Sequence, residues 1–285
     1  MGSDRVNLAR WDGHTHTQFC PHGSREPTEQ FIQRAIEKGF RIYSLTEHPP
    51  LPNDFHDPTP DQSCGMRVGD LEAYLDHALA LKIKYSRDIE VRVGLEIDYI
   101  PGFEPAIRDL LRSVGSQLDD ALLSVHFLPG KGGWRCVDYS SEDFQDGLVD
   151  VYGSVEAVHD AYWKMITQAI QADLGPCAPR RIGHLSLINK FQLKHPLPNP
   201  DQFRPEVVAI LDLISEEKVH LDLNAAGLFK PDCRETYPAP WIIAEALKRK
   251  IEFVFGSDTH SVNGVGKGFD QAQQILDSIT VDGYL

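Results

Sequence analysis

The segment Trp11-Asp-Gly-His-Thr-His-Thr17 places two histidines two residues apart near the start of this chain. Side chains at positions i and i+2 of a β-strand point to one face, so the imidazoles of His14 and His16 can reach a single ion. Asp258-Thr-His260 repeats the spacing near the other end of the chain. In a closed barrel the last strand lies beside the first, and the two segments together therefore predict one shared metal site.

Between these segments, short apolar runs alternate with helical patterns. Strands are predicted at residues 11–17, 41–46, 90–97, 121–127, 181–187, 219–224 and 251–256. A helix is predicted after each strand, at residues 28–39, 70–85, 105–112, 155–174, 205–218, 239–250 and 269–279. Residues 128–153 are rich in Gly, Asp and Ser and are predicted to form loops over one face. The alternation predicts a parallel sheet, and it fits both a closed barrel and an open doubly wound sheet.

The polar residues at the strand ends favour the barrel. Every predicted strand carries a ligand-capable side chain at its carboxyl end: His14 and His16, Glu47 and His48, Glu96 and Asp98, His126, His184, Asn224, and Asp258 with His260. In a β/α barrel these ends meet where the βα loops build the active site. In an open sheet they would form a line that is too spread to converge. Because the chain has 285 residues and 41% hydrophobic content, we predict one domain, residues 1–285, with its core at about 11–280.

Composition excludes several classes of protein. The formal net charge is −14 and no basic stripe is visible, which argues against a nucleic-acid partner. No apolar stretch reaches the ~20 residues of a membrane span, and residues 1–10 lack the apolar region of a signal peptide. The five cysteines are scattered, odd in number and form no C-x-x-C pair, which is typical of free thiols in a reducing cytosol. We therefore expect a cytoplasmic protein, and we make no prediction of its oligomeric state.

Histidine placement predicts a metal-dependent enzyme. Seven of the twelve histidines fall at or just beyond strand ends, and one of these seven is His22, in the first βα loop. Imidazole and carboxylate together suit zinc, iron or manganese rather than calcium or magnesium. The remaining histidines are expected to have no ligand role: His56, His77, His159, His195 and His220.

The ligand series of this chain resembles that of the polymerase-and-histidinol-phosphatase (PHP) superfamily. The series is filled at every position: His14, His16, His22, His48, Glu96, His126, His184, Asp258 and His260. Within the superfamily, Arg181-Ile-Gly-His184 and Asn224-Ala-Ala-Gly-Leu228 are similar to strings in the histidinol-phosphate phosphatases of histidine biosynthesis. The resemblance runs from about residue 11 to 270.

The resemblance implies a distorted (β/α)7 barrel and three divalent ions, zinc with iron or manganese as alternatives. The first ion would be held by His14, His16, Glu96 and Asp258, the second by Glu96, His126 and His184, and the third by His22, His48 and His260. The implied reaction is hydrolysis of L-histidinol phosphate to L-histidinol and inorganic phosphate by a metal-activated hydroxide. The partner is then a small phosphorylated molecule.

Further residues are assigned roles beside the ligands. Glu96, Asp258 and Arg181 are the catalytic candidates, with Asp258 either passing a proton to the leaving group or acting only as a ligand. Arg181, Asn224 and Lys230 are candidate substrate contacts, since a guanidinium matches phosphate geometry. Three carboxylates are predicted to orient ligand imidazoles: Asp12, Glu47 and Asp98. Residues Glu142, Asp143 and Asp146 could meet the substrate amine or form a plain solvated acidic loop.

Three other functions fit parts of the same pattern. Another PHP-type phosphoesterase, acting on nucleotides or sugar phosphates, would use the same ligands. An amidohydrolase-like C–N hydrolase also begins with His-x-His, but such barrels normally have eight strands and often a bridging lysine at strand four, where this chain has His126. A non-catalytic metal-binding module is disfavoured because every ligand position is filled.

Overall fold

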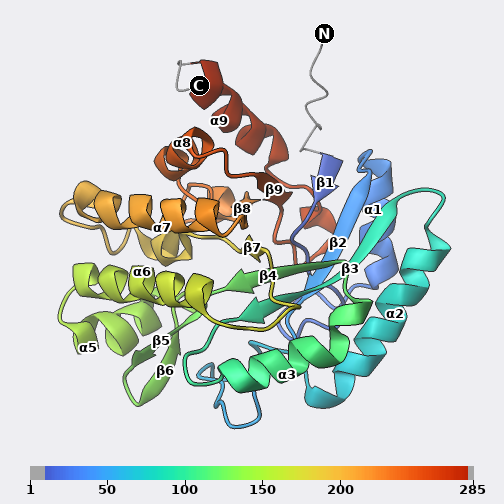
Figure 1. The fold of residues 1–285 in the computed structure, drawn as a ribbon, viewed down its shortest axis with the longest axis horizontal. Helices are drawn as coiled ribbons and strands as arrows, with labels where there is room; N and C mark the ends of the chain where they lie inside the picture. The colour runs from blue at the N-terminus through green and yellow to red at the C-terminus, as the bar shows by residue number, and fades with distance from the viewer. Residues whose placement is uncertain (1–9, 282–285) are drawn as a thin grey trace.

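A seven-stranded parallel sheet curls into a barrel in this computed structural model, which describes residues 10–281 (Figure 1). The strands are β1 (Trp11–Asp12), β2 (Ile42–Glu47), β3 (Glu90–Asp98), β4 (Asp120–Ser124), β7 (Arg181–Ile182), β8 (His220–Asn224) and β9 (Phe253–Gly256), in that spatial order. The barrel closes between its first and last strands, where the Gly13 amide donates to the Phe255 carbonyl (2.7 Å) and Thr15 forms a parallel bridge with Thr259. The predicted single-domain (β/α)7 barrel is confirmed, and it is distorted because β1 and β7 are only two residues long.

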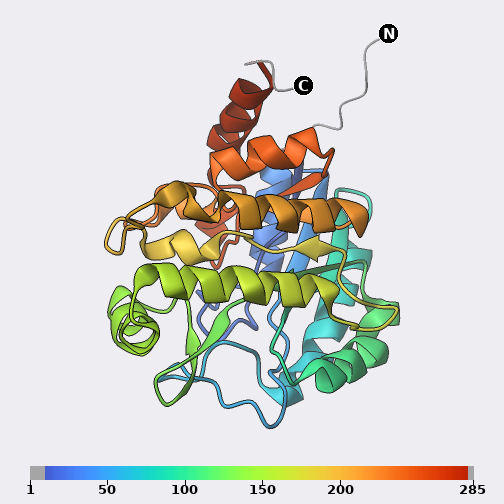
Figure 2. The same cartoon turned by 60° about the vertical axis from the view of Figure 1, so that its left-hand side comes forward.

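Helices follow the strands and lie on the outside of the barrel (Figures 1 and 2). The main helices are α1 (Thr28–Glu37), α2 (Leu71–Lys84), α3 (Glu104–Val114), α6 (Val155–Gln171), α7 (Arg204–Glu216), α8 (Pro240–Lys248) and α9 (Phe269–Val281). Short helical turns connect them: η2 (Val68–Asp70), η3 (Gly115–Gln117), η5 (Leu187–Phe191), η6 (Pro200–Phe203), η7 (Ala226–Phe229) and η8 (Val262–Gly264). Local chemistry sets some of the ends. Ser154 caps α6 by accepting from the Ala157 amide, and Gly39 lets the chain leave α1 with φ of 79°.

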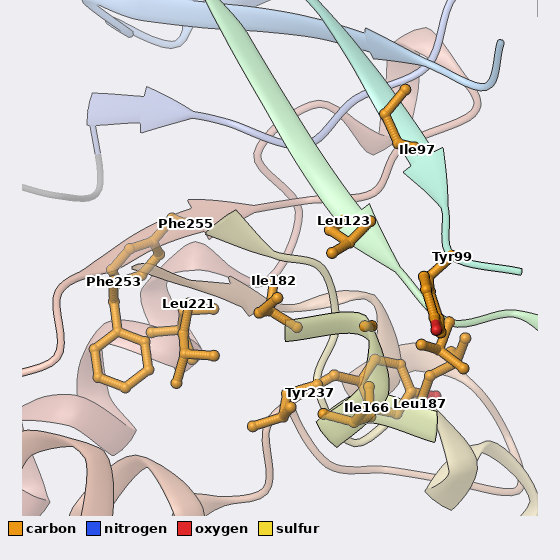
Figure 3. Packing of buried hydrophobic residues seen from close by; sticks show 14 of the residues in the cluster. Ile97, Tyr99, Leu123, Ile166, Ile182, Leu187, Leu221, Tyr237, Phe253 and Phe255 are labelled. Atoms are coloured by element: carbon orange, nitrogen blue, oxygen red, sulfur yellow. The ribbon is translucent and has the colours of Figure 1, made fainter. Parts of the chain in front are cut away.

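The core fills the space between the barrel and its helices (Figure 3). Leu221 and Phe255, on neighbouring strands, are fully buried, and Leu123 is almost fully buried. Both faces of a parallel sheet are covered in such a fold. Side chains on the outer face of the strands are apolar and pack against the helices, and those on the inner face fill the barrel. Each large apolar side chain buried in this way stabilises the fold by about 2 kcal/mol. The result is a rigid scaffold that fixes where each strand ends.

The excursion after β4 differs from the prediction of plain loops. It forms a hairpin, β5 (Phe127–Gly130) with β6 (Gly133–Cys136), and then three short helical segments, α4 (Ser141–Asp143), η4 (Phe144–Val149) and α5 (Asp150–Tyr152). The reason is a set of apolar side chains hidden among the Gly and Asp residues: Phe127, Leu128, Phe144 and Leu148 are all buried. Their burial orders a segment whose composition resembles that of a loop.

Membrane-spanning helices and a signal peptide are both predicted to be absent. No helix within residues 10–281 has the length and apolar character needed to cross a bilayer. The prediction about a signal peptide concerns residues 1–10, and residues 1–9 lie outside the described part of the chain.

Candidate metal centre and active site

A cavity of about 420 Å³ opens at the carboxyl ends of the barrel strands. The predicted ligands that line it are His22, His48, Glu96, His126, His184, Asp258 and His260. His14 and His16 lie directly behind them and are fully buried. The structure thus brings all nine side chains of the predicted ligand series to one place.

The first group of predicted ligands combines side chains from the segment after β1, from β3 and from the loop after β9. His14 Nε2 lies 3.0 Å from Glu96 Oε2, and His16 Nε2 lies 3.4 Å from the same oxygen. His16 Nε2 is also 3.2 Å from Asp258 Oδ1. Asp258 has a left-handed backbone, with φ of 50°, and its amide donates to the His14 carbonyl (2.8 Å). Such a conformation costs free energy for a non-glycine residue, and here it aims a carboxylate at His14 and His16, which follow β1.

The second group lies on the other side of Glu96. Glu96 Oε1 is 2.9 Å from His184 Nε2, and His126 Nε2 is 3.1 Å from the same nitrogen. Ser124 donates its hydroxyl to Glu96 Oε1 (2.7 Å), which fixes the carboxylate. Since Oε2 faces the first group and Oε1 faces the second, Glu96 is placed to bridge two ions.

The third group is His22, His48 and His260 at the mouth of the cavity. Its rings pack against the first group, with His16 stacked on His260 at 4.1 Å and on His48 at 4.5 Å between ring centroids. Figure 1 shows why residues so distant in sequence meet, because the loops after β1, β2 and β9 adjoin where the barrel closes.

The donor atoms of this third group fit a bound cation. His22 donates from Nδ1 to the Ser63 carbonyl (2.8 Å), and His260 Nδ1 lies 3.1 Å from the Asp258 carbonyl. With a ring proton on Nδ1, each Nε2 carries a lone pair. The two Nε2 atoms are nevertheless 2.9 Å apart and face each other. A cation between them satisfies both lone pairs, as two hydrogen-bond acceptors cannot satisfy each other.

Electrostatics in the cluster also favour positive charge. Burial alone would raise the pKa of Glu96, but His14 and His48 hold it well below its usual range, so this carboxylate stays ionised. Burial opposes protonation of His126, yet Asp98 and Glu96 raise its pKa to about 10. Burial, followed by the nearby His16, holds the pKa of His260 well below its usual value. Proteins bind transition metals through neutral imidazoles: His260 already has this form, and a bound cation would displace the proton from His126 beside its ionised carboxylates.

Oxygen atoms outside the cluster orient the ligand rings through Nδ1. Glu47 and Asp98 act as predicted, at 3.1 Å from His16 and 2.6 Å from His126. Asp12 does not contact a ring. It accepts from the Ser257 amide (2.9 Å) and hydroxyl (2.7 Å) and so anchors the loop after β9. Fixing Nδ1 in this way leaves Nε2 to bind the metal.

Sequence reasoning missed Asp222, which orients His14. Asp222 is fully buried on β8, and its Oδ2 lies 2.7 Å from His14 Nδ1. Its Oδ1 has no hydrogen-bond partner. The alternation of β8 could have revealed it, because Leu221 and Leu223 face the helices and the residues between and after them face the barrel interior.

Two predicted substrate contacts lie away from the cavity. Arg181 is the first residue of β7, so it lies at the amino end of the barrel, where its Nη2 donates to Asp120 Oδ2 (2.8 Å) and to the Gly13 carbonyl (2.7 Å). Asn224 is fully buried and donates to Asp222 Oδ2 (3.1 Å) and Asp258 Oδ2 (3.2 Å). The geometry corrects both assignments, since Arg181 forms a structural ion pair and Asn224 positions a ligand carboxylate.

Cationic and anionic side chains do line the cavity away from the ligands. Lys230, the third candidate substrate contact, lies on the cavity wall. Lys190 lies there too, but its Nζ contacts Asp138 Oδ2 (2.9 Å), and this lysine holds the pKa of Asp138 well below its usual range despite burial. The acidic residues proposed for the amine, Glu142, Asp143 and Asp146, are not among the lining residues, which favours the solvated-loop alternative.

Comparisons with known proteins identify the family of this chain. Residues 12–226 match the family model described as the PHP domain. The chain is 40% identical to the histidinol-phosphatase of Bacillus subtilis, over 92% of this chain and 98% of the relative. It is 41% identical to a Listeria monocytogenes protein assigned as a histidinol phosphatase, whose crystal structure aligns with a TM-score of 0.89 over 92% of this chain and 99% of that one.

A more distant structure shows the same fold. The histidinol phosphate phosphatase of Lactococcus lactis, solved with zinc, L-histidinol and phosphate, is 17% identical and aligns with a TM-score of 0.70. The alignment covers 94% of this chain and 93% of that one. At this identity the likeness establishes the shared barrel.

Proposed function

Because this chain belongs to the histidinol-phosphatase family of PHP-domain proteins, we propose that it hydrolyses L-histidinol phosphate to L-histidinol and inorganic phosphate. The observation that carries the proposal is the convergence of imidazole Nε2 atoms and two carboxylates at the cavity, with the Nε2 lone pairs of His22 and His260 facing each other at 2.9 Å. Such a donor set suits metal-assisted hydrolysis of a phosphate ester.

We assign three divalent ions, zinc first, to the three groups of ligands. His14, His16, Glu96 and Asp258 would hold one, Glu96, His126 and His184 the second, and His22, His48 and His260 the third. When bound, the ions would supply Lewis acidity for the phosphoryl oxygens and activate a water molecule near neutral pH. Glu96, which faces two groups at once, would be shared by the ions of both groups.

The remaining residues of the cavity would bind the two ends of the substrate. Within the described chain, Lys190 and Asp138 neutralise each other, whereas Lys230 and Asp61 form no ion pair. Lys230 would therefore contact the phosphate, and Asp61 the cationic amine. The aromatic rings of Phe127 and Tyr139 also line the cavity and offer a face to the imidazole.

The rival reactions predict different substrates and a different barrel. An amidohydrolase-like enzyme would normally have an eighth strand, whereas the sheet of the described chain has seven. A phosphatase for nucleotides or sugar phosphates would not need a carboxylate placed for an amine.

A substrate panel tests the proposal. The zinc-loaded protein should release phosphate from L-histidinol phosphate with a kcat/KM about 100-fold or more above that for a 3′-nucleotide, a sugar phosphate or an aryl phosphate, because the others lack the cationic amine. Comparable turnover of all four would overturn the substrate assignment, and preference for a nucleotide or sugar phosphate would establish the alternative.

Two variants with matched controls test the substrate contacts. Lys230→Met should lower kcat/KM about tenfold for every ester, whereas Lys267→Met, which removes a lysine lying over the Phe229 ring, should not. Asp61→Asn should weaken only the ester with an amine. Asp54→Asn, an exposed residue of the same loop that does not line the cavity, is its control.

A further inference from the structure

Two cysteines from distant parts of the chain meet in the cavity wall. Cys64 lies in the loop after β2 and Cys136 ends β6, and both line the cavity. They pack in one small apolar cluster around Phe55 and Phe127. The Cys64 thiol donates to Thr59 Oγ1 (3.7 Å), and it is close enough to Cys136 to raise the pKa of that thiol. The sequence shows no C-x-x-C spacing, so this pair exists only through the fold.

The two thiols differ in accessibility and in reactivity. Cys64 is half-buried and can be reached from the cavity, whereas Cys136 is buried. Cys136 Sγ donates to Asp138 Oδ1 (3.0 Å), so a negative charge stands beside it. The neighbouring Cys64 thiol, followed by burial and Asp138, keeps the pKa of Cys136 well above its usual value. Cys64 is thus the thiol that reacts first, and Cys136 is placed to react second.

We propose that Cys64 and Cys136 form a reversible disulfide when the protein meets a small-molecule disulfide. The Cys64 thiolate attacks one sulfur of that reagent, forming a mixed disulfide and expelling one thiolate. Cys136 then attacks the Cys64 sulfur, expels the second thiolate and gives up its proton to it. The protein loses two electrons and two protons, and the reagent is reduced to two thiols.

The disulfide would affect the third group of ligands through one backbone carbonyl, which accepts a hydrogen bond from a ligand ring. Ser63, adjacent to Cys64, accepts from Nδ1 of His22 (2.8 Å). A disulfide brings the sulfurs to about 2.05 Å, closer than two thiols in van der Waals contact, so the loop carrying Ser63 would move toward β6. The bond from Cys136 to Asp138 is lost at the same time. Oxidation would therefore loosen the orientation of His22 and alter the cavity wall.

Peptide mapping of the zinc-loaded protein tests the disulfide directly. After incubation with oxidised glutathione, non-reducing digestion should give one cross-linked peptide pair containing Cys64 and Cys136, lighter than the free pair by two hydrogen atoms. Dithiothreitol should reverse it. Cys177→Ser, which removes an exposed cysteine, should leave the cross-link intact. Glutathione remaining attached to Cys64, or both thiols remaining free, would overturn the proposal.

A second measurement follows the effect on the site, and this part rests on the proposed phosphatase function. Oxidation should lower phosphate release about tenfold, the lower end of the loss expected when an outer partner of a metal ligand is disturbed. Cys64→Ser and Cys136→Ser should each show the same activity before and after glutathione treatment. An equal loss in Cys64→Ser and in the wild type would overturn the coupling. Failure of the phosphatase assignment would leave the cross-link result unaffected.

Discussion

Two polar layers lie inside the barrel, one at each end, and they satisfy their buried groups in opposite ways. At the amino end, the Trp11 indole donates to Ser44 (2.9 Å), Ser44 donates to Asp120 (2.6 Å), and Arg181 donates to the same carboxylate (2.8 Å). Donors meet acceptors, and one positive charge meets one negative charge. The charges of this lower layer are complete within the protein itself, although Nε and Nη1 of Arg181 have no hydrogen-bond partner.

The upper layer, at the carboxyl end, is not complete in the same sense. Acceptor faces acceptor between His22 and His260, and the Nε2 atoms of His126 and His184 lie 3.1 Å apart. Two acceptors cannot hydrogen-bond each other, so the arrangement at His22 and His260 favours a cation between them. Burial of a polar side chain therefore does not identify a functional site by itself. The mismatch between neighbouring groups does.

Removal of Glu96 should have the largest effect, because it bridges two groups of the upper layer. Glu96→Ala should lower phosphate release about 1,000-fold and should reduce the bound zinc. Metal analysis and phosphate release measure both. Glu90→Ala, an exposed residue on the same strand, is the control. Activity within a few-fold of wild type would contradict the role of Glu96.

The lower layer should respond in stability and not in chemistry. Arg181→Met leaves Asp120 buried without its cation and should lower the free energy of unfolding by about 3 kcal/mol. Zinc content and the kcat/KM of the folded protein should stay close to wild type. Urea unfolding and phosphate release distinguish the two. Lost activity with unchanged stability would return Arg181 to the phosphate site.

Asp222 tests whether support for the upper layer can be separated from the ligands themselves. Asp222→Asn keeps the shape but removes the charge beside His14 Nδ1, and it should weaken zinc binding 10- to 100-fold, by about 1.4 to 2.7 kcal/mol. Competition with a chelator measures the affinity. Asp212→Asn, which removes a carboxylate paired with Arg249 on the surface, should have no effect. Equal zinc affinity in both variants would show that Asp222 is only structural.

His159 is a buried histidine outside both layers and should give a smaller effect, on acid stability. Burial lowers its pKa to about 4 from an ordinary value near 6.5. The unfolded chain therefore binds a proton that the folded chain excludes, and stability falls as pH drops from 6.5 toward 4. At pH 5 the loss is about 2 kcal/mol.

A neutral replacement isolates that contribution. His159 stacks on the Phe203 ring, and a phenylalanine can replace it there. Between pH 7.5 and pH 5, the free energy of unfolding of His159→Phe should fall by about 2 kcal/mol less than that of the wild type. Urea unfolding at the two pH values measures the difference. Equal losses in the two proteins would mean that His159 is protonated in the folded state.

The barrel and the ligand series could be predicted from sequence because both follow from local patterns. Apolar runs located all seven strands, although the predictions at 11–17 and 181–187 run five residues beyond the ends of β1 and β7. The predicted ligands stand at strand ends that a closed barrel must bring together. The spacing of His14 and His16 needed no knowledge of the rest of the chain.

Features that depend on which distant residue lies opposite could not be predicted in this way. Arg181 matched a family string, but its role is decided by Asp120 on another strand. Cys64 and Cys136 meet only because a loop and a hairpin share one wall. Asp222 is different, since the alternation in β8 contained the signal and it was overlooked.

The meeting of β1 with β9 has a consequence for how the barrel opens. That junction rests on few backbone bonds, including the one from Gly13 to Phe255. An ion bound by both His16 and Asp258 would act as a removable cross-link between the two ends of the chain. That cross-link would close a loop of nearly the whole chain length. Removal of the ion would weaken the contact between β1 and β9, so the metal-free protein would lose thermal stability together with its activity.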